Sequence, residues 1–282
     1  MWAVVGTTLL VAICFTLSYY LLPTYWLIFL VLSCVVPLPK FPKLGHAALG
    51  RALRKRLHYE IHTHGNVLEA GGQYIFATAP HGILSFAEML TFVLPDLQED
   101  YFPRAVVPLV ASQLLWIPFL GVFARLAGCQ NVGHSNFLRN IKNGNSVALA
   151  PGGTKEMALS QDSQLRILQR EGFLRIAHAE GVKVVPLLSV GELSAHTVMR
   201  SNRKLQQRSY ELLFYPFPLL FYGAWGSIWP RDNGKLDIHV GRTIDPSGKT
   251  LENFITEYYT VLAHLGPKII LLDEKTKIDE FE

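Results

Sequence analysis

One histidine stands where a general base is expected. His81 follows an apolar stretch at residues 73–79 (QYIFATA) that is typical of a buried strand. In an open α/β sheet, ligands collect beyond the carboxyl ends of the strands, and an imidazole there can accept a proton. Pro80 and Gly82 fix the backbone on either side and let a substrate approach closely. The alternative interpretation is a histidine that only caps a turn.

A glycine-rich turn occupies the equivalent place after a second apolar stretch. Residues 146–150 (SVALA) are followed by PGGTKE. The backbone N–H groups of Gly152 and Gly153 could hold an anion or an oxyanion. Glu156 could orient a histidine or hold a hydroxyl group. An ordinary strand-to-helix turn with solvated side chains is the alternative.

A third polar pair ends a third predicted strand. Residues 182–190 (VKVVPLLSV) are directly followed by Gly191-Glu192. Three polar pairs at one sheet edge indicate a site more strongly than any one of them does. We therefore predict catalytic roles for His81 and Glu156. The predicted substrate-binding residues are Pro80, Gly82, Gly152, Gly153, Gly191 and Glu192.

The elements that position these residues follow from hydrophobic patterning. A fourth strand is expected over residues 235–241. Helices are expected over residues 44–64, over residues 161–180 and from Leu251 to Gly266-Pro267. Buried strands that alternate with helices predict an α/β domain with a largely parallel sheet.

The N-terminal segment predicts a membrane anchor. Residues 1–39 contain no charged side chain and exceed the length needed to cross a bilayer. Pro23 divides the segment, which favours a helical hairpin over one long helix. Basic residues from Lys40 onward place that side in the cytoplasm. We predict a hairpin over residues 1–39 and a cytoplasmic-face domain over residues 40–282; a cleaved signal peptide is the alternative.

Two further uncharged stretches occur at residues 105–124 and 212–230. Both contain internal prolines, and helix–strand alternation continues on either side. We expect them to lie on the membrane surface or to line the substrate site, with true spans as the alternative. Tyrosine and tryptophan favour the membrane interface, and the second stretch is rich in both.

Several function classes lack sequence support. The three cysteines do not form a disulfide framework, and no dinucleotide-binding or Walker motif is present. The net charge of +4 is modest and no nucleic-acid-binding motif accompanies it. His58 and His62 have helical i, i+4 spacing, but without a convincing third ligand we predict no metal site. A serine-nucleophile role for the segment around His134 is also unsupported.

The order of motifs resembles the type 2 diacylglycerol acyltransferase family. It runs from the membrane hairpin through YIFATAPHG, APGGTKE and REGFLRIAHAEGVKVVPLLSVGE to HVGRTI, over roughly residues 15–265. The family's His-Pro-His-Gly appears here with Ala79 in place of the first histidine, and His81 matches the second, catalytic one. Phosphate-accepting relatives carry an aspartate five positions later, where this chain has Phe86. The nearest acid is Glu88, and Glu156 is the candidate partner.

The resemblance implies an acyl-CoA-dependent O-acyltransferase of the endoplasmic reticulum membrane, with lipid droplets as a further location. Its co-substrate would be a fatty acyl-CoA and its acceptor a neutral glycerolipid, foremost diacylglycerol. Membrane lipids are expected as partners, whereas nucleic acid and cofactors are not. Whether the protein forms a homo-oligomer is left open. The alternatives are a monoacylglycerol, long-chain-alcohol or lysophospholipid acyltransferase, and a non-catalytic lipid-binding membrane protein.

Overall fold

A computed structural model describes residues 46–65, 68–69, 71–93, 106–116, 120–159, 164–199, 201–232 and 234–280. The predicted hairpin over residues 1–39 and the domain boundary at residue 40 lie outside these residues and stay predictions. Among the described helices, none combines the length and apolar character that crossing a bilayer requires.

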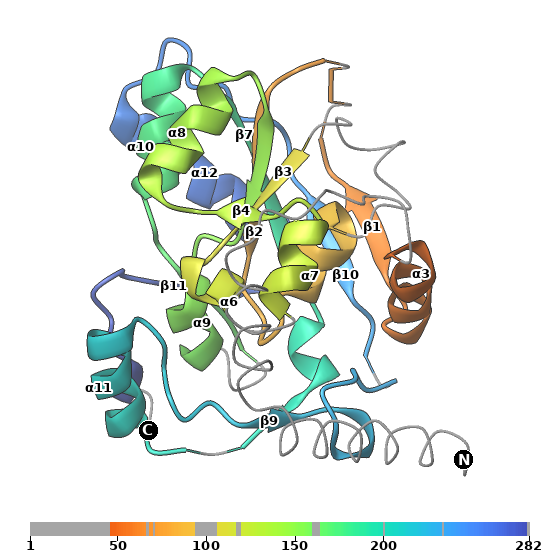
Figure 1. Cartoon of the computed structure of the whole chain (residues 1–282). Coiled ribbons are helices and arrows are strands. Elements are labelled where there is room, and N and C mark those ends of the chain that lie inside the picture. Colours follow the sequence, from red (N-terminus) through yellow and green to blue (C-terminus); the bar gives the residue numbers. More distant parts are fainter. Residues whose placement is uncertain are drawn as a thin grey trace, which may run out of the picture.

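A seven-stranded sheet forms the centre of the fold (Figure 1). Its strand order is β1-β10-β7-β2-β5-β3-β4. Strand β10 runs antiparallel to β7, and the other neighbours are parallel. The predicted α/β fold with a largely parallel sheet is confirmed. The strands are β1 (Glu60–Thr63), β2 (Tyr74–Ala79), β3 (Val106–Val110), β4 (Gln130–Asn131), β5 (Ser146–Leu149), β7 (Lys183–Val190) and β10 (Asp237–Val240).

Apolar side chains bury both faces of the sheet. Successive side chains of a strand point to opposite faces, so β2 contributes Ile75 and Ala77 to one core and Tyr74 and Phe76 to the other. The first core contains α8, α10 and α12, and the second contains α3, α4 and η1. These elements are α3 (His46–Arg56), α4 (Phe86–Glu88), η1 (Met89–Val93), α8 (His134–Lys142), α10 (Gly172–Glu180) and α12 (Leu251–Ala263).

Two small ladders and several short helices complete the domain. Strand β6 (Leu165–Leu168) pairs in parallel with β11 (Ile269–Leu272), and β8 (Thr197–Val198) pairs antiparallel with β9 (Phe221–Tyr222). The remaining elements are α6 (Ser112–Trp116), α7 (Leu120–Leu126), α9 (Gly153–Leu159), η2 (Glu192–Ala195), α11 (Arg203–Leu213), η3 (Ala224–Gly226) and η4 (Ile278–Glu280).

The predicted buried strands are confirmed. Those at residues 73–79, 146–150, 182–190 and 235–241 correspond to β2, β5, β7 and β10. The last predicted helix corresponds to α12, and its N-terminus is capped by the Thr250 hydroxyl, which accepts from the backbone amide of Asn253.

Two predicted helices are partly wrong. The helix over 44–64 ends at Arg56, and β1 follows it and pairs with β10. The helix over 161–180 starts only at Gly172, because Leu165–Leu168 form β6. In both cases pairing with a segment about 100 residues or more away overrides the local helical spacing.

The apolar stretch at 105–124 is not a surface element along its whole length. Its described part contributes β3 to the sheet, between β5 and β4, and then forms the short helices α6 and α7. The predicted membrane-surface role is therefore wrong for the β3 portion. Strand β3 lies inside the sheet and its Leu109 is buried.

Candidate functional site

The three polar motifs lie at one edge of the sheet. Strand β2 is the parallel neighbour of both β7 and β5. The register sets Ala77 opposite Leu149 on one side, and Ala79 opposite Leu188 on the other. The turns that follow these three strands are therefore neighbours, as the sequence predicted. We call this the carboxyl edge.

His81 lies in the turn after β2, with its side chain half-buried. Its Nδ1 is 2.5 Å from the carbonyl oxygen of Gly82, so Nδ1 carries the proton and donates this hydrogen bond. No atom of the described residues forms a hydrogen bond with His81 Nε2. Burial lowers the pKa of His81 below its usual 6.5. The imidazole is therefore neutral near pH 7, with a lone pair on Nε2 that can accept a proton.

Glu156 contacts His81 through the backbone and not through the imidazole. Its Oε2 accepts the His81 backbone N–H at 2.6 Å, and its Oε1 accepts the backbone N–H of Leu168 at 2.8 Å. The predicted imidazole-orienting contact is therefore wrong. Burial raises the pKa of Glu156 to about 7, although the two hydrogen bonds from backbone amides act to lower it. This carboxylate joins the His81 turn to β6 from the first turn of α9.

Glu192 holds the other side of the same turn. The Ser189 hydroxyl donates to its Oε2 at 2.9 Å. Burial raises the pKa of Glu192 to about 7, although the nearby backbone amides of Phe86 and Ala87 favour the charged form. Because Phe86 begins α4, Glu192 faces the start of the helix that directly follows the His81 turn.

Two of the predicted substrate-binding glycines lie against these carboxylates. A Cβ on Gly82 would come within 2.6 Å of the Glu192 carboxyl carbon, and a Cβ on Gly152 within 2.1 Å of that of Glu156. Both glycines thus make room for a buried glutamate side chain. Pro80 is buried at the end of β2 and continues the backbone into the turn.

At the other two positions, the backbone conformation itself requires glycine. Gly191 has a φ of 90°, and a Cβ there would meet the carbonyl oxygen of Lys235 at 1.8 Å. Gly153 has a φ of 58° and its amide donates to the Ala150 carbonyl at 3.3 Å. An oxyanion site at Gly152 and Gly153 stays a prediction. It requires the hydrogen bond between the Gly153 amide and the Ala150 carbonyl to break.

A third buried carboxyl group lies near this site. Burial raises the pKa of Glu88 to about 8, and repulsion from Glu192 adds to the shift. The Ser85 hydroxyl is 3.4 Å from Glu88 Oε2. The sequence offered no signal for Ser85 or Ser189, because short polar side chains at strand ends and turns are common.

Phe86 occupies the position where phosphate-accepting relatives carry an aspartate. Its ring stacks on His196 at 5.5 Å between centroids, and the two planes differ by 8°. His196 Nε2 lies 2.9 Å from the carbonyl oxygen of Ile228. Phe86 thus stacks on a different histidine from the one in the motif, and the sequence analysis did not anticipate His196.

Among the described residues, one group of potential metal ligands occurs, on the neighbouring strands β1 and β10. Ligand atoms of Glu60, His62 and Asp237 lie within 4.8 Å of one another. The Lys235 ammonium already contacts Glu60 at 2.6 Å and Asp237 at 3.2 Å. These carboxylates are neutralised by a side chain of the protein itself, and we assign no ion to them.

Comparison with known proteins identifies the family. The sequence pattern of the family described as Diacylglycerol acyltransferase matches residues 54–268. The chain is 29% identical over 219 residues to mouse Diacylglycerol O-acyltransferase 2-like protein 6, covering 68% of this chain and 64% of that protein. It is 27% identical over 219 residues to Dictyostelium discoideum Diacylglycerol O-acyltransferase 2, with coverages of 69% and 65%. The aligned region thus spans just under two thirds of each relative.

A solved structure is also similar. It is the 1-acyl-sn-glycerophosphate (LPA) acyltransferase PlsC from Thermotoga maritima, with a TM-score of 0.46 and 15% identity, covering 90% of this chain and 95% of that one. The family assignment depends on the sequence pattern, which extends from α3 to the start of β11 and includes all three motifs of the carboxyl edge. This chain belongs to the diacylglycerol acyltransferase family.

Proposed function

We propose that this protein transfers a fatty acyl group from acyl-CoA to the hydroxyl of a neutral glycerolipid, foremost diacylglycerol, which gives triacylglycerol. The observation that supports this most directly is the state of His81. Its imidazole is neutral, its Nε2 has no hydrogen-bond partner among the described residues, and its turn is held by two buried glutamates.

The reaction needs one proton acceptor and then one proton donor. In the proposed mechanism, His81 Nε2 removes the acceptor's hydroxyl proton as the oxygen attacks the thioester carbonyl carbon. The tetrahedral intermediate then expels the CoA sulfur, which takes the proton back from the imidazolium. General acid–base catalysis of this kind contributes about 10²–10⁴-fold to the rate. No metal or redox step is required.

The charges around His81 favour a neutral acceptor over a phosphorylated one. Glu88, Glu156 and Glu192 are all buried, and repulsion from Glu192 raises the pKa of the other two. A phosphate group close to these side chains would meet like charges whenever they are ionised. The Phe86–His196 stack adds apolar surface where phosphate-accepting relatives have a carboxylate.

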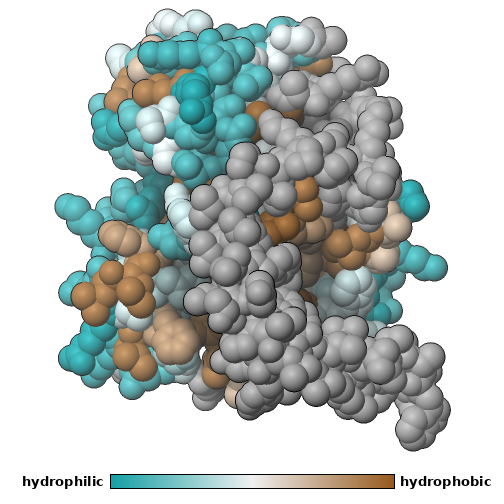
Figure 2. Space-filling model, viewed as in Figure 1, coloured by the Kyte–Doolittle hydropathy of each residue, from teal (hydrophilic) through white to brown (hydrophobic). Residues whose placement is uncertain are grey.

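Membrane association is part of the proposal. Besides the predicted hairpin, residues 199–228 expose large apolar side chains, which we call the 199–228 face. Leu212 is 80% exposed and Trp225 is 85% exposed. Figure 2 shows apolar surface in the region where Figure 1 places α11. The guanidinium groups of Arg56 and Arg231 lie over Trp225 and Tyr222, at 5.2 and 5.1 Å. Aromatic and basic side chains together suit the interface of an anionic membrane.

The further exposed members of the 199–228 face are Met199, Leu205, Leu213, Phe214, Phe217, Leu220, Tyr222 and Ile228. An exposed apolar surface of this kind marks an interaction site in a folded protein. In this proposal it lets the acceptor reach the site from the membrane while acyl-CoA arrives from the cytosol. Location in the endoplasmic reticulum, or on lipid droplets, belongs to the same proposal.

Expression in cells that make no triacylglycerol tests the function. Cells expressing the wild-type chain should accumulate triacylglycerol, and cells expressing His81→Ala at equal protein level should not. Microsomes should then be assayed with labelled oleoyl-CoA and each acceptor class separately. Greater activity with monoacylglycerol, a long-chain alcohol or a lysophospholipid would reassign the acceptor. Membrane binding without transfer to any acceptor would favour a non-catalytic lipid-binding protein.

A further inference from the structure

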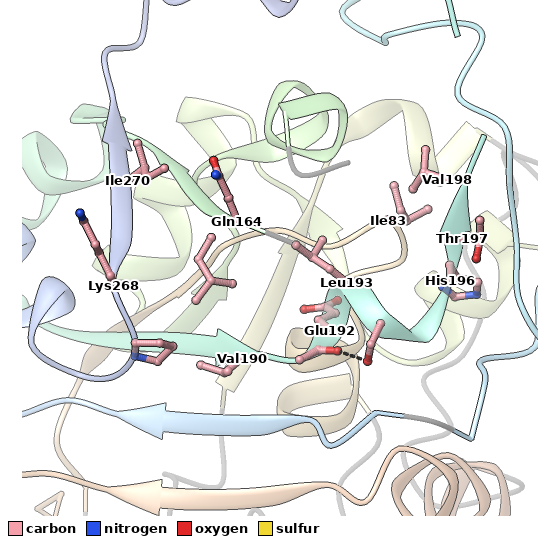
Figure 3. A pocket seen from close by; sticks show the side chains of 14 residues that line it. Ile83, Gln164, Val190, Glu192, Leu193, His196, Thr197, Val198, Lys268 and Ile270 are labelled. Atoms are coloured by element: carbon pink, nitrogen blue, oxygen red, sulfur yellow. Dashed lines mark hydrogen bonds between the residues drawn. The ribbon is translucent and has the colours of Figure 1, made fainter. Parts of the chain in front are cut away.

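A cleft of about 720 Å³ opens beside the candidate site, a volume typical of sites for small molecules (Figure 3). In Figure 3, Lys268 and Ile270 lie at one end, His196 and Val198 lie at the other, and Glu192 lies between them. The walls come from β6, the end of β7, η2, β8 and β11.

The walls of this cleft are mainly apolar. The apolar lining side chains are aliphatic and come from four separate stretches of the chain: Ile83, Leu165, Val190, Leu193, Val198, Pro267 and Ile270. The polar side chains among them largely have partners inside the protein. His196 contacts the Ile228 carbonyl, Ser194 donates to the Gly191 carbonyl, and Glu192 accepts from Ser189. A ligand therefore gains mostly from burying apolar surface here.

The cleft adjoins the His81 turn through two of its lining residues. Ile83 lines it and follows His81 by two residues. Glu192 also lines it, and the same carboxylate lies against Gly82. A long chain in the cleft would thus have one end next to the His81 turn. Its other end would lie toward Lys268, which is exposed to solvent.

We propose that this cleft binds an aliphatic chain of a lipid substrate, with the ester-forming end toward His81. This inference deepens the proposed acyltransferase function and rests on it. The chain could belong to acyl-CoA or to the acceptor, and the apolar chemistry of binding is the same for both. Residues of β8 and β11 that narrow the cleft would then determine which chain lengths react.

Filling the cleft tests this. Val198→Trp and Ile270→Trp each add a large ring to a wall of the cleft, and neither residue is in the His81 turn. Val132→Trp is the matched control, since Val132 is 38% exposed and does not line the cleft. The first arm varies the donor from octanoyl- to palmitoyl-CoA at fixed dioleoylglycerol. The second arm varies the acceptor from dioctanoyl- to dioleoylglycerol at fixed donor.

We expect kcat/KM for the longest chain to fall about tenfold or more relative to the shortest chain, in one arm only. The affected arm identifies whether the chain comes from acyl-CoA or from the acceptor. An unchanged chain-length profile in both arms, with folded and active variants, would overturn the inference while leaving the proposed function intact.

A second measurement does not depend on turnover. A palmitoyl-CoA analogue and a diacylglycerol analogue, each with a photoreactive group at the end of one chain, should attach to peptides of β8, η2 or β11 in the wild-type protein. Val198→Trp should reduce that labelling. Labelling confined to other segments would contradict the cleft assignment, even if the protein proved to have no acyltransferase activity.

Discussion

The backbone amide of His81 donates to Glu156 Oε2 at 2.6 Å, so the two residues interact through the main chain of one and the side chain of the other. The Glu156 carboxylate therefore shapes the turn, and no hydrogen bond between described residues joins it to the imidazole. The two residues should therefore respond differently to substitution.

His81→Ala should reduce acyl transfer by at least about 10²-fold, because the general base is lost. The hydrogen bond from the backbone amide to Glu156 persists, so the fold should survive. His58→Ala and His134→Ala are controls that should leave turnover nearly unchanged, because both side chains are exposed. Rates must be compared at equal membrane-bound protein, because a loss of stability lowers abundance. An active His81→Ala protein would exclude the proposed mechanism.

Glu156→Gln should impair both the fold and turnover. The carboxylate accepts two backbone N–H groups, whereas a glutamine amide offers one oxygen and would place its NH₂ group against a donor. The loss should be about 1–3 kcal/mol in the free energy of unfolding, and turnover per folded molecule should fall as the His81 turn shifts. Thermal unfolding and single-turnover rates would separate the two effects. Glu180→Gln is the control, because Glu180 is exposed. Wild-type stability and turnover of Glu156→Gln would show that the two hydrogen bonds to the carboxylate are dispensable.

Gly82→Ala should be far more damaging than Gly172→Ala. The added methyl group at residue 82 meets the Glu192 carboxyl group at 2.6 Å, whereas at residue 172 nothing lies within 4 Å. Displacing a buried carboxylate should cost about 1–3 kcal/mol of stability. Melting temperatures of the two variants, measured side by side in the same detergent, check this. Equal melting temperatures would mean that Glu192 moves aside freely.

Glu88 should make the protein less stable as the pH rises. The unfolded chain releases this proton near pH 4.5, whereas the native state keeps it to about pH 8. Between these values the native state binds more protons, so the free energy of unfolding falls with increasing pH. Glu88→Gln should weaken this pH dependence, to which the raised pKa values of Glu156 and Glu192 also contribute, and should raise the melting temperature near pH 8. Exposed Glu252→Gln should leave the profile unchanged; a flat wild-type profile would contradict the assignment.

The 199–228 face should bind membranes without the predicted hairpin. A chain lacking residues 1–39 should still sediment with anionic vesicles, because each buried Leu or Trp side chain contributes about 1.5–3 kcal/mol. Replacing Leu212, Leu213 and Trp225 together with serine should release it, and Val132→Ser should not. If all of the truncated chain stayed in the supernatant, residues 1–39 would be responsible for membrane binding and the 199–228 face would not.

The sequence predicted the parts of the fold that depend on local patterning. Continuous apolar runs indicated β2, β5 and β7, and their parallel arrangement placed the three motifs together. Strands β1 and β6 were missed because their short segments also fit helical spacing and their partners lie far along the chain. Pairing of that kind is a tertiary effect that no local window contains.

At the candidate site, the sequence indicated which residues lie close together but not which atoms form the hydrogen bonds between them. Glu156 was expected to contact an imidazole, and it binds two backbone amides instead. Gly82 was expected to let a substrate approach and Gly152 to offer its amide to an oxyanion, and the structure shows that both also make room for buried carboxylates. Residue type and spacing do not specify which atoms of a turn face a carboxylate, because that depends on side-chain packing across three turns.

The pairing of β6 with β11 has a consequence for synthesis of the protein. Leu168, whose amide binds Glu156, ends β6, and among the described residues the sheet partner of β6 is β11 at residues 269–272. Lys155 Nζ, beside Glu156, also donates to the Glu274 carbonyl at 2.7 Å. A nascent chain therefore cannot complete the surroundings of His81 until residues 269–274 have left the ribosome. The His81 turn is set only after this distant segment has been synthesised, long after the predicted N-terminal anchor has met the membrane.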